Sequence, residues 1–288
     1  MNLFSIESLR CSYDKPYFEG VSRVVLEIKH LYLERGKIIF IVGESGIGKS
    51  TILETLGMMN NTIVPDVSAR FVFHEKDGRQ TDLCALWQAD DDVMSRFRLQ
   101  NYSFIFQNTN LMRNFTAYEN VAYTRMLQGY SRQECFEHTH HVLDTLGLGK
   151  IDETRMTQEL SGGQLQRLAF ARAILPDYTV LFGDEPTGNL DPENAVKVMQ
   201  VLSDKSGKDS DSTAIIVSHD MHLATRFADV IIKIRKESRS KSHGQDENVT
   251  YGIIDEASVF MPNENRTKWK SANNFFETED FEDYLQKK

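Results

Sequence analysis

The stretch from residue 43 to residue 51 constrains this chain more than any other. It fits the pattern G-x-x-x-x-G-K-[ST] and follows a short apolar, β-branched run at residues 37–42. A run typical of a helix start follows at residues 52–56. This strand–loop–helix order is the context that a phosphate-binding loop requires. The loop consists of Gly43, Glu44, Ser45, Gly46, Ile47, Gly48, Lys49, Ser50 and Thr51.

The residue types of this loop suit a polyphosphate. Glycines let the backbone turn tightly, so that consecutive N–H groups point into one concavity. The helix N-terminus adds unpaired donors and the positive end of its dipole. Lys49 is expected to reach the β- and γ-phosphates of a nucleotide, and the Ser50 hydroxyl to ligate Mg²⁺. A plain Gly-rich turn before a helix is the alternative, and residues elsewhere in the chain argue against it.

A pair of carboxylates, Asp184 and Glu185, ends an apolar strand predicted at residues 179–184. A phosphate loop needs an aspartate at the end of such a strand to hold Mg²⁺. Adjacent positions on a strand end let Asp184 face the metal, opposite Ser50. Glu185 can then polarise the water that attacks the γ-phosphate. A strand that merely ends in an acidic turn is the alternative.

A second anion site is predicted at residues 160–164, which read Leu-Ser-Gly-Gly-Gln. Ser161 is expected to cap a helix that runs from Gln164 to about residue 174. Gly162 and Gly163 leave the first N–H groups of that helix open to an anion. Both phosphate sites can serve one nucleotide if two copies of the chain pair head to tail.

In this order the motifs resemble the nucleotide-binding subunit of an ATP-binding cassette (ABC) transporter, over about residues 3–257. The resemblance implies an ATPase that uses ATP and Mg²⁺. It implies that Gln107 touches Mg²⁺ or the attacking water and relays to a membrane partner, and that His219 contacts the γ-phosphate. Ser161, Gly162 and Gly163 would close on ATP bound to the opposite protomer. Further family positions are Gln164 and, in the D-loop at residues 188–191, Asp191.

Residues 115–121 and 184–191 resemble a narrower exporter group, which includes the lipoprotein-releasing and macrolide-efflux systems and the cell-division ATPase. We therefore expect an ATPase dimer that drives a separate transmembrane permease, docked between Asn108 and Asn120, for export or for lipoprotein, peptide or drug extrusion. The alternative is an ATPase that regulates a membrane-bound cell-division or signalling complex without transport. A DNA-repair or chromosome-organising ATPase would carry long heptad segments, and the sequence has none.

The predicted fold is α/β, of the P-loop NTPase type found in ABC proteins. It has a mostly parallel core sheet, an antiparallel β subdomain and an inserted α-helical subdomain. The ATPase domain is expected at residues 1–257, with the helical subdomain at about 108–175. An acidic C-terminal extension follows at 258–288. Residues 230–234 and 251–254 are predicted to form a terminal hairpin, split by a polar insert at 235–248 that is expected to be a solvated loop. The extension is predicted either to form a short helix that docks on the domain or on a partner, or to fray.

Three smaller features have two interpretations each. Tyr13 is either a base-stacking aromatic or a half-buried strand tyrosine, and Phe18 competes with it for the stacking role. The acids at 90–92 are predicted to cap a helix running to about residue 99 rather than to hold a metal. The histidines at 138, 140 and 141 are predicted to lie on a solvated helix face rather than to bind a metal.

Composition restricts the partners and the compartment. The chain has 33 basic and 42 acidic residues, a net charge of −9, which gives no general attraction to nucleic acid or to an anionic membrane. Its three scattered cysteines suggest neither a disulfide framework nor a zinc site. No apolar run approaches the roughly 20 residues that span a bilayer, and no signal peptide is evident. We expect a cytoplasmic protein held at the inner face of the membrane by its partner.

Overall fold

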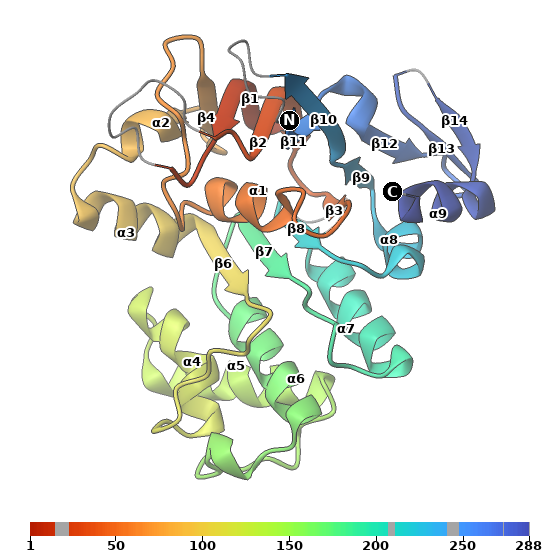
Figure 1. Ribbon diagram of the computed structural model, residues 1–288. Coiled ribbons are helices and arrows are strands. Elements are labelled where there is room, and N and C mark those ends of the chain that lie inside the picture. Colours follow the sequence, from red (N-terminus) through yellow and green to blue (C-terminus); the bar gives the residue numbers. More distant parts are fainter. Residues whose placement is uncertain (15–22, 207–210, 241–247, 273, 288) are drawn as a thin grey trace.

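The computed structural model describes residues 1–14, 23–206, 211–240, 248–272 and 274–287. An eight-stranded sheet runs through the centre of the molecule, in the order β14-β13-β12-β9-β3-β8-β7-β6 (Figure 1). Its strands are β3 (Ile38–Val42), β6 (Tyr102–Ile105), β7 (Val180–Asp184), β8 (Thr213–Val217), β9 (Val230–Lys233), β12 (Val259–Pro262), β13 (Lys268–Lys270) and β14 (Phe275–Glu277).

The five strands β6, β7, β8, β3 and β9 are parallel, which confirms the predicted core. Every residue of β3 and of β8 is buried, as expected for strands covered on both faces. Side chains alternate along β3. Ile39 and Ile41 pack toward helix α1 (Lys49–Leu56) and the second sheet, whereas Phe40 and Val42 pack toward the helices on the other face.

The second sheet has six strands in the order β10-β11-β2-β1-β4-β5. Strands β2, β1, β4 and β5 pair with one another in antiparallel order, which confirms the predicted antiparallel region near the N-terminus. Strand β11 joins them by pairing with β2 in parallel. The strands are β1 (Asn2–Cys11), β2 (Leu26–Glu34), β4 (Arg70–His74), β5 (Gln80–Asp82), β10 (Arg235–Ser240) and β11 (Asn248–Ile254).

Helices α4 (Ala117–Leu127), α5 (Arg132–Thr145) and α6 (Gly162–Ile174) form the lower lobe in Figure 1, with the 3-10 turn η1 (Thr157–Glu159) before α6. Ser131 and Glu134 form the capping box predicted for α5. The three histidines of α5 are exposed. The ring of His140 bonds the Tyr118 hydroxyl at 2.9 Å. Among the described residues, no group of three or more His, Cys, Asp or Glu side chains is arranged to hold a metal.

The remaining helices pack around the sheets. Asp90 occupies the N-cap position of α3, but its side chain makes no capping hydrogen bond. Asp91 and Asp92 lie in the first turn, where the dipole favours acids. The helix was therefore predicted correctly and the side-chain cap was not. These elements are α2 (Leu83–Leu86), α3 (Asp91–Asn101), α7 (Pro192–Lys205), α8 (Met221–Phe227), α9 (Thr278–Gln286) and the 3-10 turn η2 (Glu256–Ser258).

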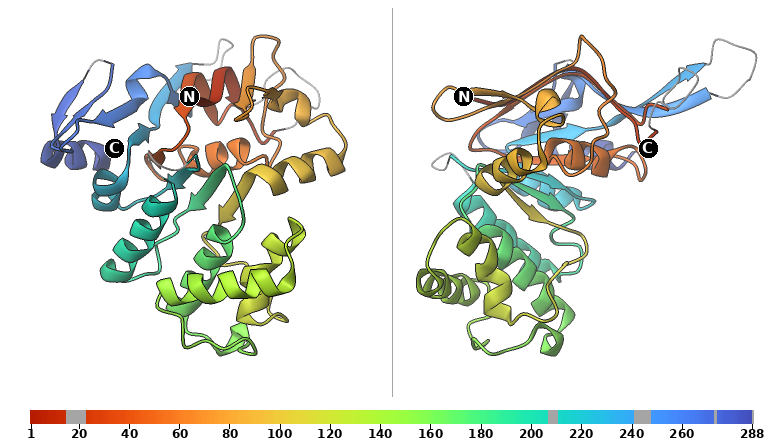
Figure 2. Two further views of the ribbon diagram at one scale, coloured as in Figure 1. Left: turned by 180° about the vertical axis from the view of Figure 1, so that it is seen from behind. Right: turned by 90° about the vertical axis from the view of Figure 1, so that its left-hand side faces the viewer.

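The predicted terminal hairpin is wrong. Strand β9 pairs with β3 and β12 in the central sheet, while residues 251–254 belong to β11 in the second sheet. The insert is not simply a loop either, because its first residues form β10, which pairs with β11 from Arg235 to Ser240. A polar run can form a strand at a sheet edge, since both of its faces meet solvent. The β10–β11 pair projects from the body of the molecule (Figure 2).

Residues 259–287 extend the central sheet and end in α9, so the docked helix is confirmed and the frayed tail is wrong. Strands β12, β13 and β14 add to β9 in antiparallel order. Trp269 and Phe281 are fully buried and stack with ring centroids 4.9 Å apart. Among the helices of the described residues, none has the length and apolarity to cross a bilayer.

Candidate functional site

The predicted phosphate-loop, catalytic and metal-binding residues lie at one edge of the central sheet. Strands β6, β7, β8 and β3 are parallel neighbours, so their C-terminal ends meet at the same edge. Gln107 follows β6, Asp184 ends β7 with Glu185 next, and His219 follows β8. The loop at residues 43–48 connects the end of β3 to α1. Topology alone thus brings together segments that lie far apart in the sequence.

The phosphate loop has the conformation that its glycines predict. Gly46 and Gly48 have φ of 77° and 110°, in the left-handed region that other residues avoid. Gly48 occupies the N-cap of α1 and no side chain caps the helix, so its first N–H groups stay open to an external acceptor. Lys49 is buried, and its ammonium donates to the carbonyls of Gly43 and Glu44 at 2.9 and 2.8 Å.

Two carboxylates, Asp184 and Glu185, lie near Lys49 at this edge, and His219 lies beside Glu185. Burial lowers the pKa of Lys49, while the nearby Glu185 and Asp184 raise it. Burial, followed by the Glu185 charge, raises the pKa of Asp184. His219 Nε2 lies 3.2 Å from Glu185 Oε1. The pKa of the half-buried Asp184 carboxyl is raised, and a second carboxylate follows it in the chain, so a cation is favoured beside Asp184 and the donor set fits Mg²⁺.

Glu185 is held in an uncommon backbone conformation. Its φ is 48°, in the left-handed region, and its N–H donates to Val217 O at 2.9 Å, which continues the pairing of β7 with β8. The Gly188 N–H then donates to Glu185 O and closes a turn. Such a conformation costs about 1–3 kcal/mol and persists where the surroundings fix it, which is common at active sites. The turn directs the side chain toward His219.

Two further predicted residues lie in well-defined local structures. Asp191 caps α7, because its carboxylate accepts from the Asn194 N–H at 3.1 Å and from the Asn194 side-chain amide at 2.6 Å. Gln107 is exposed, two residues beyond Ile105, which pairs with Gly183 in β7. The register therefore places Gln107 at the level of Glu185.

The predicted position of Tyr13 in a strand is wrong. Tyr13 lies beyond the end of β1, and its side chain is 54% exposed. Its hydroxyl donates to Glu54 Oε2 at 3.0 Å and lies 3.2 Å from Thr51 Oγ1, so the ring is fixed to α1. Base stacking by this ring stays a prediction. Phe18, which competes for that role, lies outside the described residues.

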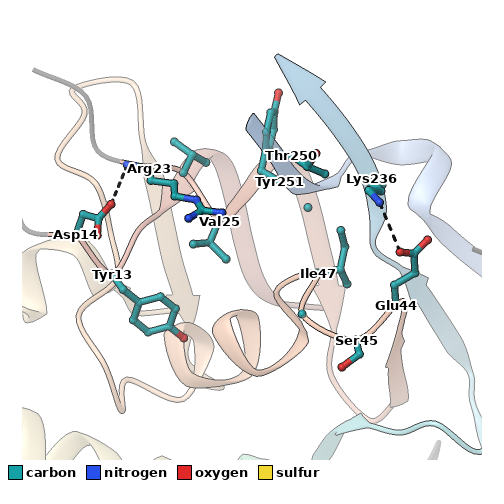
Figure 3. Close-up of a pocket in the computed structure, with 13 residues that line it drawn as sticks. Tyr13, Asp14, Arg23, Val25, Glu44, Ser45, Ile47, Lys236, Thr250 and Tyr251 are labelled. Atoms are coloured by element: carbon teal, nitrogen blue, oxygen red, sulfur yellow. Dashed lines mark hydrogen bonds and ion pairs between the residues drawn. The ribbon is translucent and has the colours of Figure 1, made fainter. Parts of the chain in front are cut away.

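A pocket of about 500 Å³ connects Tyr13 to the phosphate loop (Figure 3). Its far wall comes from the β10–β11 pair and includes Lys236, whose ammonium lies 3.9 Å from Glu44 Oε2. The sequence did not point to this wall, because no motif marks the residues of β10 and β11. The lining residues are Tyr13, Asp14, Arg23, Val24, Val25, Glu44, Ser45, Gly46, Ile47, Lys236, Thr250, Tyr251 and Gly252.

The predicted second anion site lies on α6, in the lower lobe, away from α1 (Figure 1). Ser161 and Gln164 form a capping box at its start, which confirms the predicted cap. Neither Gly162 nor Gly163 has a positive φ, and a Cβ on either would meet nothing within 4 Å. Neither the local backbone nor the packing within the chain therefore requires glycine at these two positions.

Comparison with known proteins identifies the family. The ABC transporter family matches residues 26–188, more than half of the chain. The chain belongs to the ABC transporter family. The motifs above are thus those of an ABC cassette that binds and hydrolyses ATP, which confirms the predictions of family, fold and enzyme class.

Two relatives place this ABC cassette more narrowly. The lipoprotein-releasing system ATP-binding protein LolD of Colwellia psychrerythraea is 31% identical over 257 residues, 88% of this chain and 94% of LolD. The macrolide export ATP-binding/permease protein MacB of Aggregatibacter actinomycetemcomitans is 35% identical over 236 residues. That match covers 82% of this chain and only 34% of MacB, so the chain spans about a third of that relative.

A solved structure has the same fold as this ABC cassette. It is the dimeric structure of MJ0796, described as a bacterial ABC transporter cassette. It superposes with a TM-score of 0.65 at 27% identity and covers 80% of this chain and 94% of that chain. A second structure of MJ0796 is a dimer in a post-hydrolysis state bound to ADP and Pi. Both MJ0796 structures are dimers.

Proposed function

We propose that the chain is the ATPase subunit of an exporter-type transporter and acts on a separate membrane-spanning partner. The resemblance to LolD over nearly the full length of both chains carries the proposal. In MacB, whose name joins ATP-binding and permease functions, the matching part is about a third of the protein. These relatives favour transport over the cell-division or signalling alternative.

We propose that two copies sandwich two ATP molecules, with the phosphate loop of one copy facing Ser161, Gly162 and Gly163 of the other. The open space above both glycines supports this arrangement, because a phosphate can approach the start of α6 without obstruction. The dimeric MJ0796 structures support it too. ATP would then favour dimer closure, because it contacts both copies only in the closed state.

Each residue at the sheet edge has a proposed role in hydrolysis. Lys49 and the open N–H groups of the loop bind the phosphates, and Glu185 accepts the proton of the attacking water. His219, 3.2 Å from Glu185, contacts the γ-phosphate and keeps Glu185 oriented. Ser50, Asp184 and Gln107 would hold Mg²⁺, which neutralises charge on the phosphates.

We propose that the partner docks at residues 108–120. Hydrogen bonds fix this segment near both of its ends. Buried Asn120 accepts from the Met112 N–H at 2.7 Å and donates to the carbonyls of Met112 and Thr116. Arg172 of α6 donates to the carbonyls of Asn110 and Thr109, both at 2.8 Å. A partner bound here would act on Gln107 at one end and on α6 at the other.

Two substitutions test the ATPase roles. Glu185→Gln removes the proton acceptor and keeps the shape, so ATP binding should persist while turnover falls by about 10²–10⁴-fold. Lys49→Ala should weaken nucleotide binding measured by calorimetry. Unchanged steady-state hydrolysis by Glu185→Gln, or unchanged ATP affinity after Lys49→Ala, would contradict the assigned roles.

The transport role has its own test. Membranes solubilised in mild detergent are passed over the tagged chain, and the proteins retained are identified. A multi-span permease should be retained by the unaltered chain and lost when exposed residues of the 108–120 segment, such as Arg113, are changed. Retention of no membrane protein, or retention that ignores this segment, would contradict the docking proposal.

A further inference from the structure

The C-terminal helix α9 lies next to the catalytic edge. A cavity of about 710 Å³ is lined on one side by Glu185, His219 and the D-loop, and on the other by Glu282 and Gln286 of α9. Figure 1 shows α9 beside α8, the helix that follows His219. The family match ends at residue 188, so nothing in it assigns a role to α9.

Helix α8 needs outside support to hold a fixed position. It has only seven residues, and a helix of that length is unstable in water by itself. Asp220, which caps it, comes directly after His219, and its carboxylate accepts from the Leu223 N–H at 2.9 Å. Any shift of α8 therefore moves His219.

Glu282 of α9 binds the outer face of α8. The Thr225 hydroxyl donates to Glu282 Oε1 at 2.5 Å, and His222 Nδ1 lies 3.6 Å from the same oxygen. Thr225 and His222 are three positions apart and lie on one face of the helix. Thr225 is buried at this contact. One carboxylate thus accepts a hydrogen bond from Thr225 and lies within ion-pair distance of the His222 ring.

The other end of α9 is tied to the phosphate-loop side of the sheet. The ammonium of Lys233 donates to the carbonyls of Tyr284 and Lys287, at 2.5 and 3.1 Å, in the last turn of α9. Lys233 pairs with Val42, the last residue of β3 before the loop. Phe281 and Leu285 are buried beneath the helix. Helix α9 is therefore fixed to the core and presents Glu282 to α8.

We propose that α9 positions the switch histidine: Glu282, through Thr225 and His222, holds α8 so that His219 stays beside Glu185. Glu282 and Thr225 are positioning residues, since they act on His219 through α8. The inference rests on the proposed role of His219. It predicts that loss of the contact lowers the rate of hydrolysis and leaves ATP binding unchanged, because the phosphate loop does not depend on α8.

The test uses the full chain with steady-state kinetics and calorimetry. Thr225→Val removes the hydroxyl at nearly constant volume, and Glu282→Ala removes the acceptor. Each should lower kcat about tenfold, as expected for loss of a hydrogen bond to a charged group, with unchanged ATP affinity. Thr225→Ser keeps the hydroxyl donor and should therefore have the kcat of the unaltered chain. Glu279→Ala, an exposed acid on the same helix, is the matched control and should match the unaltered chain.

A double-mutant cycle separates positioning from general loss of stability. If Glu282 acts through His219, Glu282→Ala should not lower kcat further in a protein that already carries His219→Ala. Additive losses, or a kcat within twofold of the unaltered chain for both folded single variants, would overturn the inference. Unchanged hydrolysis by His219→Ala alone would instead refute the proposed role of His219, so the two failures are distinguishable.

Discussion

Replacing Gly252 with alanine tests whether the β10–β11 pair sets the shape of the phosphate loop. Gly252 pairs with Leu26 of β2, and its N–H donates to Val25 O at 2.9 Å. A Cβ built at Gly252 would lie 2.2 Å from Ile47 O and 2.8 Å from a methyl carbon of Ile234. The φ of Gly252 is not in the left-handed region, so the space available to the added Cβ alone decides the effect of the substitution.

The magnitude follows from that contact. Real Cβ atoms essentially never come closer than 3.0 Å, and the atom in the way belongs to the loop backbone, so the loop or the strand must move. Overpacking of this kind costs about 1–3 kcal/mol in stability. If the loop moves, an N–H donor loses alignment with a phosphate. Such a bond to a charged group contributes about 1.5–3 kcal/mol, so nucleotide affinity should fall about 10- to 100-fold.

The assay is calorimetric titration with a non-hydrolysable ATP analogue, beside thermal unfolding of the free protein. Gly149→Ala is the matched control, because its Cβ would meet the movable side chain of Asp144 rather than backbone oxygen. Lys236→Gln removes the 3.9 Å ion pair with Glu44 alone, and exposed pairs contribute little, so its effect should be small. A dissociation constant for Gly252→Ala within twofold of the unaltered chain would refute the reasoning.

Two other substitutions give separate tests. The pKa of Asp184 is raised, by burial first and then by Glu185. The folded state therefore binds this proton more tightly than the unfolded chain, and the stability Asp184 contributes falls as pH rises through the raised pKa. Asp184→Asn should thus raise the Tm of the nucleotide-free protein at pH 7, abolish hydrolysis, and lose its Tm advantage in acid; an unchanged Tm at pH 7 would contradict this. Trp269→Ala should cost about 3–5 kcal/mol of unfolding free energy, seen as a large drop in Tm, because it empties a buried site against Phe281; a drop of only a degree or two would argue against docking of the C-terminal segment.

The proposed catalytic residues at this edge of the central sheet were predictable, because their chemistry limits the choice of residue type. A loop that binds phosphate needs glycines and a lysine, and a strand that ends at a metal needs an acid. The residue types at positions 43–51 and 184–185 therefore indicate the local structure directly. The continuous apolar runs of β3 and β8 indicated the buried parallel core for a similar reason.

The C-terminal region was less predictable because its strands are short and pair with distant partners. Strands β13 and β14 have three residues each, too few for any alternation to be read. Strand β10 is wholly polar, so it has no apolar signal at all. Strand β11 pairs with β2, which lies more than 200 residues earlier in the chain. Strand β9, which precedes β10 in the sequence, belongs to the other sheet. Contacts of this kind are fixed by tertiary packing and not by local propensity.

The position of β3 restricts when the nucleotide site can form during synthesis. This wholly apolar strand lies between β8 and β9, which begin at Thr213 and Val230. A ribosome adds about 5–20 residues per second, so β3 waits roughly ten to thirty seconds for its first neighbour. Until then the lysine-bearing loop has no sheet to hold it, and an unpaired apolar strand is open to wrong partners. Nascent chains that stop before β8 should therefore depend on chaperones and fail to retain ATP.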